Sequence, residues 1–288
     1  MKRILIPSLL LLSAVSQAQG VNVEMQLNKD GDVDPISSFP LQWSEHYFSK
    51  ISYRSVTYGE VDDSELMQRS SQTIRDQYLR LDLLGYQSSG SGMNWQLAGG
   101  AEAIRINREE FGYGEFNSQT LLLDNSVEVE VYRAVVSGEM RWQSEHLEIS
   151  VGGDLSPYGS LTVEQDTWVS YNGEANADSS HSGTMKPAYG AQLGLVLKSG
   201  FDLDLELGAE YDYLPLEYDF DVLNSDGDDF NEETVTLKQK TTRLSAKLIL
   251  PAYAGLGRLT LGAASEKIKT ESADNTVNYV VFGMQQGF

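Results

Sequence analysis

An acidic row marks the segment between positions 201 and 214, where carboxylates recur at every second position around one glycine. The row consists of Asp202, Asp204, Glu206, Glu210 and Asp212. Arg243 and Lys247 share one register of the segment 235–250. If the two segments are consecutive antiparallel strands, these bases face the acids across a hairpin. Such charges either fill an interior as a network of ion pairs or line a narrow passage that prefers cations.

A second acidic segment offers oxygen ligands for a divalent cation. Its candidate ligands are Asn224, Asp226, Asp228 and Glu233. An Asn, an Asp, a Gly and a Glu seven residues after Asp226 match part of an EF-hand loop, but Val222 occupies the first ligand position. The segment 28–34 has a similar composition. A solvated acidic loop is the default interpretation of both segments, and loose Ca²⁺ or Mg²⁺ binding stays open.

Hydrolytic chemistry would need a histidine within hydrogen-bond reach of a carboxylate or a hydroxyl. The three histidines are His46, His146 and His181. Only His181, beside Ser180, falls in a segment expected to be an outer loop, and that Ser-rich segment is interpreted as solvated. Asp219 and Asp221 form a close pair of carboxylates, but no His stands two residues away from either of them. We therefore predict no enzyme activity and no cofactor.

The elements that would position these groups are β-strands, because polar and apolar residues alternate with a period of two. The ten predicted strands cover 43–58, 73–86, 92–106, 128–142, 146–160, 187–198, 201–214, 235–250, 257–270 and 276–288. Connections after the even-numbered strands are short. Four of the others, at 59–72, 107–127, 161–186 and 215–234, are long and are predicted to be loops.

Composition narrows the class of protein. Hydrophobic residues make up 41% of the chain and mean hydropathy is −0.31, and no run approaches the roughly 18 apolar residues of a transmembrane helix. The absence of Cys excludes disulfides as the source of stability. The formal net charge of −21 makes nucleic acid a poor partner.

The N-terminal residues indicate export. Lys2 and Arg3 precede an apolar run at 4–12, and small residues at Ser16 and Ala18 fit a signal peptidase site. Residues 1–18 are therefore predicted to be a signal peptide. Residues 19–42 show little periodicity and are predicted to be a periplasmic N-terminal extension, followed by a barrel at 43–288.

The C-terminal segment carries a resemblance to a known class. Apolar side chains recur at Val280, Phe282 and Met284, and the chain ends on Phe288. This pattern resembles the last strand of a bacterial outer-membrane β-barrel. The resemblance implies an all-β, transmembrane, antiparallel up-and-down barrel in the cell outer membrane, with about ten strands, short periplasmic turns and long extracellular loops. It also implies that the barrel assembly machinery reads Phe288. Size and strand number are similar to those of the omptins, ten-stranded outer-membrane proteases, but this chain has no positions that match their catalytic residues.

A cluster of basic residues is a candidate binding site for a membrane lipid. Lys238, Lys240, Lys267 and Lys269 continue the outward registers of two paired predicted strands, and Arg105 shares that register on a third. A compact group of cations suits phosphate, so we predict that these residues bind lipopolysaccharide. Ordinary snorkelling of long side chains at the membrane interface is the alternative interpretation.

These observations predict a non-enzymatic outer-membrane barrel with a structural or surface-interaction role through acidic extracellular loops, and with a lumen largely filled by ion pairs. A narrow, porin-like, cation-preferring diffusion channel is the alternative function. An omptin-like surface hydrolase has less support because no base is placed for it.

Overall fold

The computed structural model describes residues 20–62, 69–90, 92–116, 119–170, 174–199, 203–223, 230–251, 257–270 and 274–287. The elements in these ranges are strands: β1 Gly20–Asn28, β2 Val33–Gln42, β3 Tyr47–Asp62, β4 Arg69–Ser89, β5 Met93–Phe116, β6 Gln119–Gln143, β7 Leu147–Ser156, β8 Gly159–Ser170, β9 Glu174–Met185, β10 Ala188–Lys198, β11 Asp204–Leu223, β12 Phe230–Ile249, β13 Arg258–Lys269 and β14 Asp274–Gly287. Among the described residues, no helix is long and apolar enough to cross a bilayer. The predicted signal peptide lies outside these residues.

The strands close into one antiparallel barrel. β1 pairs with β14, with Met25 opposite Phe282, and this pairing joins the two ends of the chain. On the other side, β7 and β10 lie between the lower halves of β6 and β11. Twelve strands thus complete the ring, and β8 and β9 extend it upward beside the upper halves of β6 and β11. We call the end of the barrel at which β4 leads into β5 the lower end, and the opposite end the upper end.

Proline residues stand at both junctions between the ring and the strands β8 and β9. β7 ends directly before Pro157, and Pro187 stands between β9 and β10. Proline has no N–H to donate to a β-ladder, which disfavours continuous pairing through these positions. The chain therefore leaves the ring after Ser156 and returns to it at Ala188.

Two features of the predicted architecture are wrong. The barrel has twelve ring strands and not about ten, because β1 and β2 lie in the segment that was expected to be an N-terminal extension and pair with β14 and β3. The segments expected to be long loops also consist mostly of strand. They form the upper parts of β3 to β6 and of β11 and β12, together with β8 and β9.

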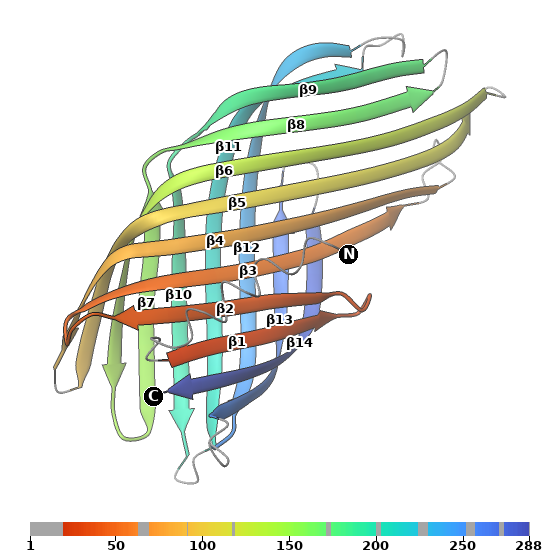
Figure 1. Ribbon diagram of the computed structural model, residues 1–288. Helices are drawn as coiled ribbons and strands as arrows, with labels where there is room; N and C mark the ends of the chain where they lie inside the picture. Colours follow the sequence, from red (N-terminus) through yellow and green to blue (C-terminus); the bar gives the residue numbers. More distant parts are fainter. Residues whose placement is uncertain are drawn as a thin grey trace.

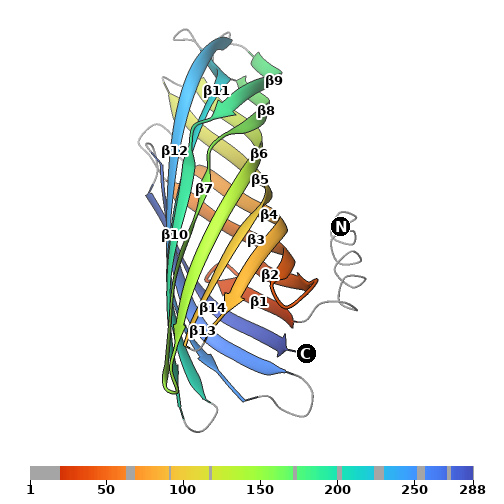
Figure 2. The same ribbon diagram turned by 90° about the vertical axis from the view of Figure 1, so that its left-hand side faces the viewer.

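Figure 1 shows the ring as two walls. β1 to β6 cross in front, with β8 and β9 above them, while β7 and β10 to β13 run steeply behind, and β14 comes to the front at its end, where it lies beside β1. Figure 2 shows the same walls from the side, with β12 along one wall and β3 to β6 along the other. Side chains that point inward from one wall can therefore meet those of the other.

The lower half exposes large apolar side chains on its outer surface. This apolar belt consists of Leu81, Leu97, Met140, Val151, Leu193, Leu207, Leu248, Leu261 and Phe282. Its members come from nine strands around the ring, and an exposed apolar surface of this extent is foreign to soluble monomers. Alternating strands with an outward apolar band are typical of barrels that face lipid.

In the upper half the apolar side chains point inward instead. They form a buried apolar layer of Ile74, Ile104, Ile106, Val129, Val131, Leu161, Val163, Leu216, Leu237 and Ile268. Within β6, the belt occupies even positions such as Met140, whereas the layer occupies odd positions such as Val131. Neighbouring residues of a strand point to opposite faces, so the strand changes its apolar face along its length. The upper half therefore has a core of the kind found in water-soluble β-proteins.

Candidate functional site in the barrel lumen

Arg54 makes the central contact of the lumen. It projects from β3 in one wall and forms ion pairs with two residues of the other wall, Glu266 of β13 and Glu210 of β11, the latter at 3.7 Å. Its guanidinium also lies 5.9 Å from the centre of the Tyr78 ring. Glu266 is fully buried, and a buried carboxylate is costly unless a cation compensates it. One arginine thus connects strands that are not neighbours in the ring.

Further polar contacts span the lumen between strands that do not pair. They are Lys247–Glu24 at 2.8 Å, Arg243–Gln26 at 3.2 Å, Gln239–Asp76 at 3.0 Å, Arg80–Asp154 at 3.8 Å and Arg258–Asp204 at 2.5 Å. The first two join β12 to β1, which are separated in the ring by β13 and β14. These contacts require the side chains to meet in the interior.

The structure places two acids of the acidic row directly opposite the two bases, but only one of these two opposed pairs forms a salt bridge. Glu206 lies opposite Lys247, and Glu210 lies opposite Arg243. Lys247 approaches Glu206 to 3.3 Å, but Arg243 turns to Glu266 at 3.4 Å. Glu210 instead forms its ion pair with Arg54. Asp202 lies outside the described residues.

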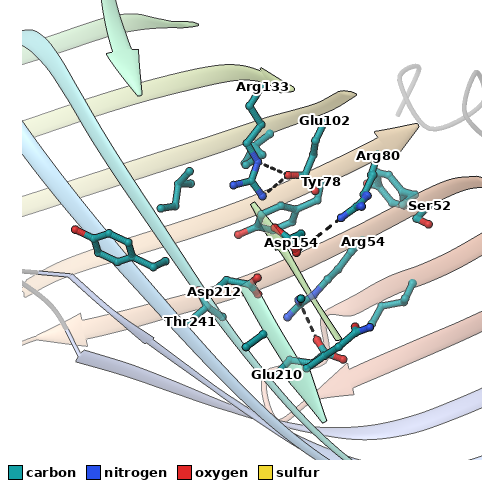
Figure 3. A pocket seen from close by; sticks show the side chains of 18 of the residues that line it. Ser52, Arg54, Tyr78, Arg80, Glu102, Arg133, Asp154, Glu210, Asp212 and Thr241 are labelled. Atoms are coloured by element: carbon teal, nitrogen blue, oxygen red, sulfur yellow. Dashed lines mark hydrogen bonds and ion pairs between the residues drawn. The ribbon is translucent and has the colours of Figure 1, made fainter. Parts of the chain in front are cut away.

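A cavity of about 330 Å³ lies within this network. Figure 3 shows Arg133 with Glu102, Arg80 with Asp154, and Arg54 with Glu210 around it. Asp154 and Asp212 flank Gly190 in register. A β-carbon at Gly190 would come within 2.6 Å of Asp212 Oδ1 and 2.7 Å of Asp154 Oδ2. A side chain at position 190 would therefore require these two carboxylates to shift.

The residues considered for hydrolysis do not form a catalytic relay. His181 Nε2 lies 3.1 Å from Ser179 Oγ and 3.4 Å from Asp221 Oδ2. A relay needs the hydroxyl and the carboxylate on opposite ring nitrogens, whereas here both contact the same one. Gln165 fixes Asp221 through its main chain, accepting from the amide at 3.0 Å and donating to the carbonyl at 2.9 Å. This cluster therefore joins β8 and β9 to β11.

The structure describes only one of the four candidate metal ligands in the segment 224–233. Asn224, Asp226 and Asp228 lie outside the described residues, and Glu233 is exposed on β12. In the 28–34 segment, Asn28 Oδ1 accepts from the amides of Asp30 and Asp32, both at 2.9 Å, and shapes the turn between β1 and β2. Asp34 accepts from the amide and the hydroxyl of Thr57. Among the described residues, no group of three or more His, Cys, Asp or Glu could hold a metal ion.

The basic residues divide into two places. Lys240 lies directly opposite Lys269, and Lys267 lies opposite Thr242 on the same face. Lys238 continues this face of β12. Arg105 is on β5, separated from β13 by β4, β3, β2, β1 and β14, and it pairs with Glu128 and Glu130. Phe288, the predicted assembly signal, lies outside the described residues.

Sequence reasoning missed the polar residues that β1 contributes to the network. Glu24 and Gln26 are buried and point inward, while Val23 and Met25 take the other face. This alternation within 21–28 is the signal that could have identified the strand.

Comparison with known proteins supports the fold. The sequence matches no protein-family model and no curated protein. The monoaromatic hydrocarbon channel CymD aligns with 99% of this chain and 92% of its own, at a TM-score of 0.50 and 10% identity. The toluene transporters TodX of Pseudomonas putida and TbuX of Ralstonia pickettii each cover 93% of this chain and 88% of their own, with TM-scores of 0.45 and 0.48 and identities of 10% and 11%.

The closed barrel and its apolar belt define the class. The protein is a β-barrel of the bacterial outer-membrane type, and it is located in the cell outer membrane.

Proposed function

We propose that this protein is a non-enzymatic, non-conducting outer-membrane barrel that projects its upper half from the cell and has a structural or surface-interaction role. The observation that carries the proposal is the set of contacts across the lumen, centred on Arg54. An aqueous path would have to break these ion pairs and leave charges such as Glu266 buried without partners. The apolar layer above them adds a second barrier to hydrated ions.

The upper half supplies the surface for the proposed interaction. It has its own buried core and an acidic face, which consists of the exposed residues Asp124, Glu164, Asp166 and Asp178 on β6, β8 and β9. Asp166 lies directly opposite Asp178, and like charges in this position repel each other. This arrangement suits a cationic partner at the cell surface, so the acidic surface that we expected on loops is proposed to lie on strands.

Recording from single barrels in planar bilayers tests the closed lumen. The wild-type protein should insert without steady unitary conductance. The matched variant Arg54→Ala/Arg243→Ala removes both cations from Glu266 and should conduct intermittently. Steady conductance of the wild type in repeated insertions would contradict the proposal.

A narrow cation-preferring channel is the second candidate, and one observation favours it. Asp212 borders the cavity, yet within the described residues no cation lies within 4.0 Å of its carboxylate. If the barrel conducts, Asp212→Asn should reduce its preference for cations, whereas Asp178→Asn on the outer surface should not. An uptake assay with toluene in vesicles also tests whether the barrel shares the cargo of the hydrocarbon channels whose fold it resembles.

A further inference from the structure

Three lysines form a compact basic patch on the outer surface of the hairpin β12–β13. Lys240 and Lys269 are directly opposite each other, and Lys267 lies on the same face, two residues below Lys269. All three side chains are exposed. Directly opposed residues of antiparallel strands have Cα atoms only about 4.5–5.5 Å apart, so a single anion could contact two ammonium groups. We call Lys240, Lys267 and Lys269 the lysine patch.

The charges of this patch are poorly compensated. Lys267 pairs with Asp274 at 2.9 Å. Within the described part of the chain, no carboxylate lies within 4.0 Å of the ammonium groups of Lys240 and Lys269. Opposed like charges destabilise an antiparallel pair, and an anion between them would remove this repulsion. Asp274 meanwhile holds the third lysine on the same side of the hairpin.

The patch lies at a defined level of the barrel. Leu244 is on the same face of β12, four residues below Lys240, which corresponds to about 13 Å along a strand. It is 58% exposed, and Leu261 on β13 is 45% exposed at the level of the belt. Thr242 and Ser265 lie between these leucines and the lysines. The patch therefore begins where the outward face changes from apolar to hydroxyl-bearing and then to cationic.

We propose that the lysine patch binds the phosphate groups of lipopolysaccharide in the outer leaflet, with the acyl chains packed on the apolar belt below. An ammonium cluster matches phosphate in charge, and the adjoining leucines match the acyl chains. A free phosphate would use only the patch, whereas a phosphorylated lipid uses both surfaces. Arg105 does not take part, because it lies on another side of the barrel and is neutralised by Glu128 and Glu130. The inference rests on the proposed orientation, in which the upper end faces outward.

Native mass spectrometry of the folded barrel with added lipid A tests the proposal. The variant Lys240→Gln/Lys267→Gln/Lys269→Gln should retain at least ten times less lipid A than the wild type. The matched control Arg105→Gln/Lys29→Gln removes two exposed cations elsewhere and should retain the wild-type amount. Equal retention by the lysine variant and the control would overturn the proposal.

Three further ligands identify the source of the phosphate. Lipid A without its phosphates should bind the wild type as weakly as lipid A binds the lysine variant. Phosphatidylglycerol and inorganic phosphate should compete poorly with lipid A. If either of these two competes as well as lipid A does, the patch is a general anion site and the assignment to lipopolysaccharide is wrong. Because retention is measured on folded protein without a conductance assay, this test can fail independently of the proposed closed lumen.

Discussion

Replacing Arg54 with Gln should destabilise the barrel more than the loss of an ordinary surface charge would. Arg54 is the main partner of Glu266, whose side chain is only 2% exposed, while that of Arg54 is 18% exposed. Removing one partner of a buried ion pair costs about 3 to 5 kcal/mol, because the other charge stays buried without compensation. Arg243 remains 3.4 Å from Glu266, so we expect a loss near the lower bound, about 3 kcal/mol.

The matched control is Arg105→Gln on the outer surface. Arg105 also forms an ion pair, with Glu128, but its side chain is 42% exposed and that of Glu128 is 26% exposed. Exposed pairs contribute up to about 1 kcal/mol, so the control should lose no more than that.

The free energy of unfolding can be measured by urea titration of the refolded barrel in lipid vesicles, followed by tryptophan fluorescence. Migration of unheated samples on gels gives an independent measure of the folded fraction. If Arg54→Gln loses no more stability than Arg105→Gln, the lumen network does not stabilise the fold and the argument from burial fails.

Four further predictions concern assembly, orientation, the upper core and the acidic face. Phe288→Ala should lower the yield of folded protein in the outer membrane, measured by heat-modifiable migration, and an unchanged yield would remove the assembly role. A tag inserted between residues 224 and 229 should be cleaved by protease added to intact cells, whereas a tag between 90 and 92 should be protected; the reverse pattern would invert the proposed orientation. Val131→Asn places an amide in the apolar layer, where Val131 is completely buried, and should cost about 1 to 3 kcal/mol in urea unfolding, whereas Thr162→Asn on the exposed face should have little effect. Asp178→Asn removes the repulsion from Asp166 and should stabilise the barrel by up to about 1 kcal/mol, with a loss of stability contradicting the assigned register.

The sequence was sufficient for those parts of the fold that depend on neighbouring residues. Alternation with a period of two identified the ring strands from β3 onward, because successive side chains of a strand point to opposite faces. The same rule predicted that Arg243 and Lys247 face the acidic row across a hairpin. β1 and β2 were missed although 21–28 alternates cleanly, because the turn-like residues at 28–34 were interpreted as part of an extension.

The upper half could not be recognised from a single register. Apolar residues change face within β6, from even positions such as Met140 to odd positions such as Val131, and this change weakens any one alternating pattern. Segments such as 107–127, which form the upper parts of β5 and β6, were therefore predicted to be loops. Their strand structure depends on burial between the two walls, which is a property of the assembled barrel.

The sequence by itself determined, from β3 onward, where the ring strands lie, which of their faces meets lipid in the lower half and which residues point into the lumen. Only the tertiary structure decided which inward side chains meet. Arg54 contacts Glu210 and Glu266, which follow it by more than 150 positions, and it meets them because the closed ring brings β3 against β11 and β13. Strand number, tilt and stagger together fix that closure, and no local pattern encodes them.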